Sequence, residues 1–154
     1  MDIFEADVID ADTILSIQQA AYLSEAKRYN DYAIPPLRQT LDQLRNQFQN
    51  HTFLKAIVNS SLVGSVRAFQ KNTSCYIGRL IVLPEFQGNG IGTQLLNEIE
   101  HCFNKVERFE LFTGAQSSEN LHLYKKTGYK EFKSKPLNEK ITFIYLEKYI
   151  NQPN

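Results

Sequence analysis

Three glycines stand at alternate positions in a short stretch of this sequence. The stretch reads Gln87, Gly88, Asn89, Gly90, Ile91, Gly92 and Thr93. An apolar run precedes it and an amphipathic pattern follows it, so we place it between a strand and a helix. Glycines allow a backbone to approach a ligand closely and to adopt positive φ. Because the first turn of a helix presents free N–H groups and the positive end of its dipole, the stretch predicts a site for phosphate or pyrophosphate.

Two common phosphate-binding motifs fit this loop poorly. A Walker-type loop ends in Gly-Lys followed by Ser or Thr, whereas this loop ends in Gly92-Thr93 without a lysine. A dinucleotide fingerprint, Gly-x-Gly-x-x-Gly, is one residue longer than the spacing from Gly88 to Gly92. A loop whose glycines serve only tight packing is the remaining structural alternative.

Two segments resemble the acyl-CoA-binding core of the GCN5-related N-acetyltransferases. That family's signature is Gln or Arg, two residues, Gly, one residue, then Gly or Ala, which Gln87, Gly90 and Gly92 satisfy. Residues 120–129 are similar to the family's Asn…Leu-Tyr-x-Lys-x-Gly-Phe/Tyr element. The likeness is strong over residues 74–132, and elsewhere it extends only to the order of elements.

This resemblance implies that acetyl-CoA binds where two parallel strands, at 76–82 and 108–113, splay apart. The pantetheine arm would lie in that gap and pair with the backbone of Leu80, Ile81 and Val82. The acetyl carbonyl would accept an N–H near Val82, which helps stabilise the developing oxyanion. The expected pyrophosphate site consists of the loop from Gln87 and the amides of Gly88, Asn89, Gly90, Ile91, Gly92 and Thr93. A neutral amine would attack the thioester directly, without an acyl-enzyme and without a metal.

The downstream helix carries two polar side chains four residues apart. Asn120 and Tyr124 therefore face one side of it. The resemblance implies that the Asn120 carboxamide pairs with pantetheine amides and that the Tyr124 hydroxyl protonates the departing thiolate. The alternative for Tyr124 is an aromatic ring that packs the helix on the sheet. Lys126 is expected at the surface near the cofactor's phosphates.

The motifs leave the general base unassigned. Many relatives carry a glutamate near the start of the strand that here begins at Ser74, and this sequence has no carboxylate there. Glu25 and Glu110 are the candidates, and for each the alternative is a solvated or ion-paired carboxylate. A water chain or an acceptor of low pKa would make a dedicated base unnecessary.

The family resemblance implies that the segment from Glu25 to Thr40 covers the acceptor site. The residues that would line it are Tyr29, Tyr32, Arg38, Gln39 and Thr40. Their mixture of aromatic and charged groups identifies no single acceptor. Because nothing marks a long peptide groove, we favour a small primary amine over a peptide or protein amino group.

The predicted strands and helices that position these residues do not alternate regularly along the chain. Strands are predicted at 2–9, 53–58, 62–70, 74–83, 109–113, 129–133 and 141–149, and helices at 10–27, 37–48, 90–103 and 117–126. Strand, helix and strand from 74 to 113 form one right-handed crossover, so those two strands are predicted to be parallel. The expected fold class is α/β (α+β), with a mixed, mostly antiparallel sheet, a splayed parallel pair, and helices on both faces.

Composition argues against several other classes of protein, and it leaves a local basic patch open. The 17 basic and 17 acidic residues give zero net charge, which argues against nucleic-acid and anionic-membrane binding. No apolar stretch approaches the ~18 residues of a membrane span, and the N-terminus lacks a signal-peptide pattern. Cys75 and Cys102 lack zinc or disulfide spacing, and with the isolated histidines they predict no metal site, only reduced, partly buried thiols in a cytoplasmic protein. The length fits one domain over residues 1–150 with a frayed tail at 151–154.

The sequence therefore predicts an acetyl-CoA-dependent N-acetyltransferase acting on a small-molecule amine or a peptide amino group. A non-catalytic acyl-CoA-binding or regulatory module is the alternative, motivated by the missing strand carboxylate. An acyl group other than acetyl also stays open. Family members are often dimers, so the resemblance leaves a homodimer open as well.

Overall fold

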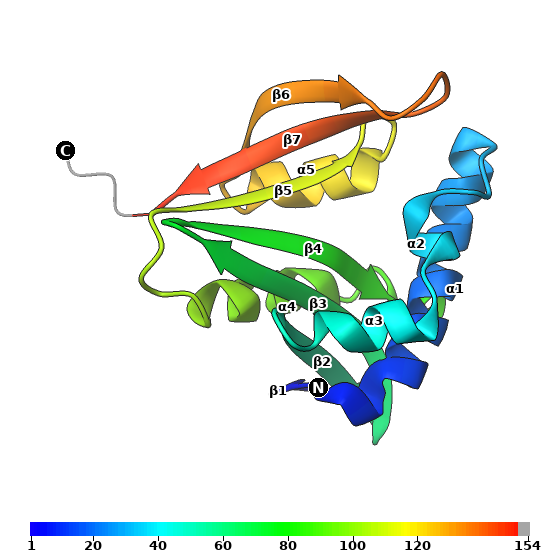
Figure 1. The fold of residues 1–154 in the computed structure, drawn as a ribbon, viewed down its shortest axis with the longest axis vertical. Coiled ribbons are helices and arrows are strands. Elements are labelled where there is room, and N and C mark those ends of the chain that lie inside the picture. Colours follow the sequence, from blue (N-terminus) through cyan, green and yellow to red (C-terminus); the bar gives the residue numbers. More distant parts are fainter. Residues whose placement is uncertain (151–154) are drawn as a thin grey trace.

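A seven-stranded mixed sheet organises residues 1–150, the part of the chain that the computed structural model describes (Figure 1). The strands are β1 (Asp2–Glu5), β2 (Thr52–Val58), β3 (Ser61–Lys71), β4 (Ser74–Val82), β5 (Arg108–Gly114), β6 (Lys130–Pro136) and β7 (Thr142–Tyr149). Their order across the sheet is β1-β2-β3-β4-β5-β7-β6. Within the described residues every neighbouring pair is antiparallel except β4 and β5, which run parallel as predicted. The predicted tail at 151–154 lies outside the described residues.

Helices cover both faces of this sheet. They are α1 (Ala11–Tyr29), α2 (Pro35–Arg38), α3 (Leu41–Gln47), α4 (Ile91–His101) and α5 (Ser118–Lys126), with 3-10 turns at Val8–Asp10 and Pro84–Phe86. Successive residues of a strand point to opposite faces. On β2, Phe53 accordingly packs in the cluster with α1 and α3, while Leu54 packs in the cluster with α4. The expected fold class is confirmed.

The apolar stripe of α4 follows from its sequence spacing. Ile91, Leu95, Leu96 and Ile99 are all buried, and they pack against the central strands. Residues three and four apart share one face of a helix, so this stripe fixes how α4 rotates on the sheet. It thereby fixes where the glycine loop ahead of α4 meets the end of β4.

Two predicted elements have different boundaries in the structure. β1 ends at Glu5, because the Asp7 side chain accepts the N–H of Ile9 and starts a 3-10 turn. The predicted helix over 37–48 is divided: α2 begins at Pro35, whose missing N–H costs nothing at a helix start, and Thr40 caps a separate α3. Its hydroxyl accepts the N–H of Gln43, so the chain turns between the two helices.

The parallel pair of strands separates soon after it begins. β4 and β5 pair only at Ser74 with Arg108, Cys75 with Phe109, and Tyr76 with Glu110. Beyond these positions the strands diverge toward α1 and α2 (Figure 1). The splay expected from the family resemblance is therefore present.

A β-bulge sits on the diverging part of β4. Gly78 pairs with Arg67 and Ile81 with Ser65, so Arg79 and Leu80 together lie opposite Val66. Arg79 has a φ of 50°, which is unusual for a residue with a side chain. A bulge bends a strand and redirects its side chains. Here it turns β4 away from β5 and aims Arg79 into the space between them.

Candidate active site

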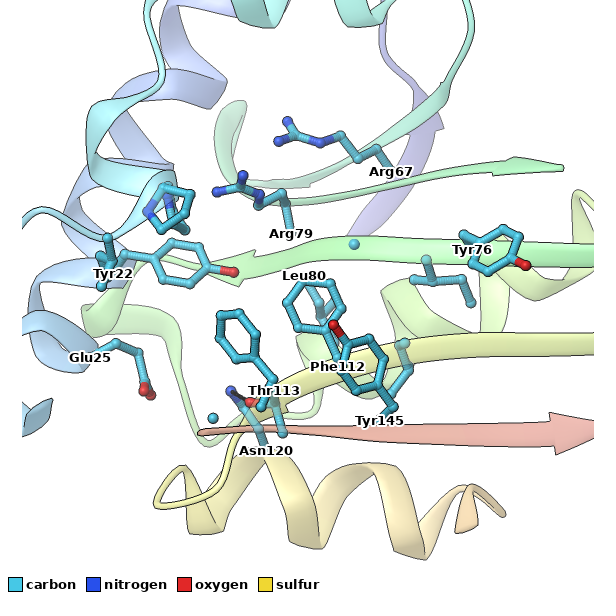
Figure 2. A pocket seen from close by; sticks show the side chains of 18 of the residues that line it. Tyr22, Glu25, Arg67, Tyr76, Arg79, Leu80, Phe112, Thr113, Asn120 and Tyr145 are labelled. Atoms are coloured by element: carbon cyan, nitrogen blue, oxygen red, sulfur yellow. Dashed lines mark hydrogen bonds between the residues drawn. The ribbon is translucent and has the colours of Figure 1, made fainter. Parts of the chain in front are cut away.

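A cavity of about 420 Å³ fills the space where β4 and β5 diverge. Side chains from α1, α2, β3, β4, β5, α5 and β7 line it, and most are apolar or aromatic (Figure 2). Enclosed, largely apolar cavities of this size with a few polar groups are typical of small-molecule sites. The splay of the sheet therefore creates a site rather than a packing defect.

The facing edges of the two strands are available to a ligand. Past Tyr76 and Glu110 neither strand pairs with the other, while the opposite edge of β5 is paired with β7 along its whole length. Leu80 lines the cavity, and Ile81 and Val82 follow it on β4. Unpaired peptide groups in such a cleft need partners, and the amides of an extended ligand arm can supply them.

The glycine loop joins this strand edge to α4. The Gln87 side chain donates to the Val82 carbonyl oxygen at 3.0 Å, which ties the loop to the end of β4. Gly88 and Gly90 both have φ of 81°, and a Cβ at either would meet no atom within 4 Å. Backbone conformation and open space, rather than tight packing, therefore account for these glycines. No side chain caps α4, so its first amides, from Ile91 onward, are free to bind an anion.

Two side chains of α5 line the same cavity, Asn120, which Figure 2 shows, and Tyr124. The Asn120 amide donates to Thr113 Oγ1 at 3.2 Å, which holds its carboxamide at the cavity wall. The Tyr124 side chain is buried and packs edge-on against Tyr129. Burial, together with Tyr22 and Glu25, raises the pKa of Tyr124 above its usual value, so its hydroxyl stays protonated at neutral pH. The Tyr124 side chain thus both packs against Tyr129 and lines the cavity.

Both candidate bases already have partners. Glu25 lines the cavity, accepts a hydrogen bond from Ser117 Oγ at 2.6 Å, and pairs with Arg28 at 3.3 Å. Glu110 also lines the cavity and pairs with Arg108 at 2.8 Å. These ion pairs correspond to the alternative that the sequence left open for each carboxylate.

The structure brings only part of the predicted acceptor segment to the cavity. Tyr29 lines it, and its hydroxyl accepts the N–H of Gln116 at 2.8 Å. Tyr32 is 59% exposed and does not line it, because the turn before α2 directs it outward. Gln39 lies beside the cavity in a network with Gln18, and it lines a shallower hollow instead. Tyr32 and Gln39 therefore do not line this cavity, and their role in binding the acceptor stays a prediction.

The remaining predicted residues lie at the surface or away from this cavity. Arg38 and Thr40 are exposed on the outer side of α2 and α3, and Lys126 is exposed at the end of α5. Ser117 precedes α5 without capping it, because its hydroxyl is directed to Glu25. For Arg38 and Thr40, exposure follows from the break between α2 and α3, which the sequence pattern did not reveal.

A family model described as an acetyltransferase (GNAT) domain matches residues 25–150. The chain belongs to this GNAT family. The resemblance inferred from the glycine loop and the α5 motif is therefore confirmed. A search of curated proteins found no match to the chain.

Several solved structures share the fold of this GNAT domain. The PaiA N-acetyltransferase of Thermoplasma acidophilum, solved in complex with coenzyme A, is 20% identical with a TM-score of 0.81, over 97% of this chain and 98% of that one. YncA, a putative acetyltransferase of Salmonella typhimurium solved with acetyl-CoA, is 16% identical with a TM-score of 0.81, over 100% and 96%. The ribosomal-protein-alanine N-acetyltransferase of Brucella melitensis is 18% identical with a TM-score of 0.78, over 97% and 100%.

Two arginines of this GNAT domain line the cavity although the sequence reading did not select them. Arg67 on β3 is only 4% exposed, and Arg79 on β4 is half-buried. Burial and the neighbouring charge of Arg79 lower the pKa of Arg67. A signal was present, because each arginine interrupts a strand of otherwise small and apolar residues, where an unpaired charge is costly.

Cys75 and Cys102 of this GNAT domain do not line the cavity, whereas His51 does. Cys75 is buried, and burial raises the pKa of its thiol to about 12, so it is a poor nucleophile at neutral pH. Cys102 is exposed, which corrects the expectation that both thiols are partly buried. Within residues 1–150, no cluster of three or more His, Cys, Asp or Glu side chains is placed to hold a metal ion. None of the helices in that range is long and apolar enough to cross a membrane.

Proposed function

We propose that this GNAT domain transfers the acetyl group of acetyl-CoA to a primary amine. The observation that carries the proposal is the end of β4–β5 pairing at Tyr76 and Glu110, beside an uncapped helix start. Together these features offer a gap for an extended arm and amides for a pyrophosphate. Two structural neighbours were solved with coenzyme A or acetyl-CoA, which supports this choice of cosubstrate.

The chain's own groups account for each part of such a ligand. The edge of β4 from Leu80 to Val82 would pair with the pantetheine amides, and the Asn120 carboxamide would assist from the opposite side. The amides that follow Gly88 would face the pyrophosphate. When bound, acetyl-CoA supplies an acetyl group activated as a thioester.

The reaction forms an N–C bond as a C–S bond breaks. The nitrogen loses one proton and the sulfur gains one. A free thiol has a pKa of about 8.5, below that of a buried tyrosine, so complete proton transfer from Tyr124 to the thiolate would be uphill. We therefore assign Tyr124 the role of a hydrogen-bond donor that stabilises the leaving sulfur.

Removal of the acceptor's proton falls to Glu25 or to water. Glu25 is the carboxylate that α1 contributes to the cavity. It already accepts a hydrogen bond from Ser117 and pairs with Arg28, so only part of its hydrogen-bonding capacity is left for an acceptor. Water that enters the cavity can serve instead, as can an acceptor that is partly neutral at working pH. We favour a small primary amine over a peptide amino group as the acceptor, because side chains from several elements surround the cavity.

A screen of amines by thermal shift with acetyl-CoA present tests the proposal, followed by a free-thiol release assay on each hit. We expect at least one amine to raise the melting temperature further and to release thiol in proportion to enzyme. Amines that bind without any thiol release would contradict catalysis. That outcome would favour the non-catalytic acyl-CoA module, which the ion-paired state of both carboxylates makes the second candidate.

A further inference from the structure

Arg67 and Arg79 place two positive charges in the wall of one cavity. They come from adjacent strands, and both side chains extend toward the end of the cavity that α1 and α2 cover (Figure 2). The guanidinium of Arg79 lies 5.9 Å from the centre of the Tyr22 ring, and that of Arg67 lies 5.2 Å from the centre of the Phe53 ring. An aromatic ring thus packs against each guanidinium group.

Neither arginine has an acidic partner. Among residues 1–150, no carboxylate lies within salt-bridge distance of Arg67 or Arg79. Arg67 donates through Nη2 to Gln39 at 3.2 Å, but its Nη1 atom and the Nη1 atom of Arg79 are buried without a hydrogen-bond partner in that range. Buried charges are ordinarily paired, so this arrangement is unusual for a purely structural role.

The other charged groups of the cavity do not compensate these two. In Figure 2, Glu25 lies on the side of Tyr22 away from Arg79, and its carboxylate is paired with Arg28. Glu110 is paired with Arg108. His51, the remaining titratable group near Arg67, has a pKa lowered by burial and by that arginine, which favours its neutral form.

The fold maintains this arrangement at a cost. Arg79 adopts positive φ within the β-bulge, a conformation that L residues with bulky side chains rarely take. Gln39 accepts hydrogen bonds from both Arg67 and Gln18. Because Gln39 lies at the break between α2 and α3, this break helps to position the Arg67 side chain. The strained backbone of Arg79 and the Gln39 hydrogen bond to Arg67 therefore both position this pair of guanidinium groups.

We infer that the acceptor is a small primary amine that carries a carboxylate, held by Arg67 and Arg79 while its amino group faces Tyr124 and the β4 edge. Guanidinium groups match the planar, two-oxygen geometry of a carboxylate. The aromatic side chains that line the cavity between the two arginines and Tyr124 would contact an apolar part of this amine. This inference rests on the proposed acetyl transfer and narrows its substrate to amino acids and related amino-carboxylates.

The test compares matched product pairs in thermal shift and calorimetry with coenzyme A present. The probes are N-acetyl amino acids with small, branched and aromatic side chains, each beside the N-acetylalkylamine that lacks only the carboxylate. Products are used so that the readout is independent of turnover. We expect at least one acid to bind about 10- to 100-fold more tightly than its neutral partner, as a charge-assisted pair provides. A phosphonate analogue of that acid shows whether a phosphoryl group is accepted as well.

Variants assign the preference to the arginines. Arg79→Gln is expected to reduce the preference for the acid to less than about threefold, and Arg79→Lys to retain part of it. Arg45→Gln, at an exposed arginine on α3, is the matched control and should leave the preference unchanged. Coenzyme A binding is measured on every variant, so that loss of fold is separated from loss of the acid site.

Three outcomes overturn the inference. The first is a folded protein that binds coenzyme A and binds no acid more tightly than its neutral partner. The second is a preference for acids that survives Arg79→Gln. The third is acetylation of peptide amino groups in place of amino acids, because the carboxyl group of a peptide's N-terminal residue is part of a peptide bond. If coenzyme A itself fails to bind, the proposed function fails instead.

Discussion

Tyr124 is the side chain whose replacement separates chemistry from binding. Tyr124→Phe removes the hydroxyl and keeps the ring that packs against Tyr129. We expect kcat to fall by about 10- to 100-fold, the effect of losing one hydrogen bond to a developing charge. The dissociation constant of acetyl-CoA, measured by calorimetry, should change by less than about twofold. An unchanged kcat would contradict the role assigned to this hydroxyl.

His51 should add a pH dependence to stability. Burial and Arg67 lower its pKa in the folded state below the value of about 6.5 that it has when unfolded. The unfolded chain therefore binds more protons in that window, and the free energy of unfolding falls as pH drops below about 6.5. Urea denaturation of the wild type and His51→Gln from pH 5 to 8 measures this, and the two curves should converge at low pH. Parallel curves would show that His51 titrates normally.

For individual residues, the sequence predicted the positions of the glycine loop and of the α5 side chains better than those of the acceptor segment. Gly88, Gly90, Asn120 and Tyr124 were found because local spacing encodes a loop conformation and a helix face. The Arg67–Arg79 pair depends on strand register and on a bulge, which a single sequence does not reveal. An acceptor site that depends on the pairing of strands is therefore difficult to predict from a single sequence.

At the scale of elements, α4 is the support for the glycine loop. Leu95 is fully buried on its apolar face, so Leu95→Ala should lower the free energy of unfolding by about 2–5 kcal/mol. Glu98→Ala, at an exposed position of the same helix, is the control and should change it by less than about 0.5 kcal/mol. Urea denaturation with unchanged m-values is the measurement. Equal effects of the two substitutions would mean that α4 does not pack as described.

Most element positions were predictable, and the exceptions have local causes. The hydrophobic period placed β2 to β5 and α4 within a few residues of their observed bounds. The predicted helix over 37–48 failed because the capping box of Thr40 and Gln43 competes with helix continuation. Side-chain caps of this kind act over three residues and outweigh a longer apolar stripe.

At the scale of the whole molecule, hydrogen bonds across the cavity mouth join α1 to the second half of the chain. Tyr29 accepts the N–H of Gln116, and Arg28 pairs with Glu119 at 3.0 Å. Tyr29→Phe should destabilise the fold by about 1 kcal/mol and raise the KM for the amine, with acetyl-CoA affinity unchanged. Tyr32→Phe, at an exposed tyrosine, is the control. Equal KM values for both variants would argue against a link between this contact and the acceptor site.

In the proposed function, the gap between β4 and β5 and the amides at the start of α4 together hold acetyl-CoA. Isothermal titration calorimetry of acetyl-CoA into the wild type and Gly90→Trp tests it most directly. Gly90 faces open space with positive φ, so an indole there should block the ligand's approach to the amides. We predict saturable binding at one site per chain for the wild type and loss of that binding in a Gly90→Trp variant that remains folded. A folded wild type without saturable heat, or a Gly90→Trp variant that binds equally well, would contradict it.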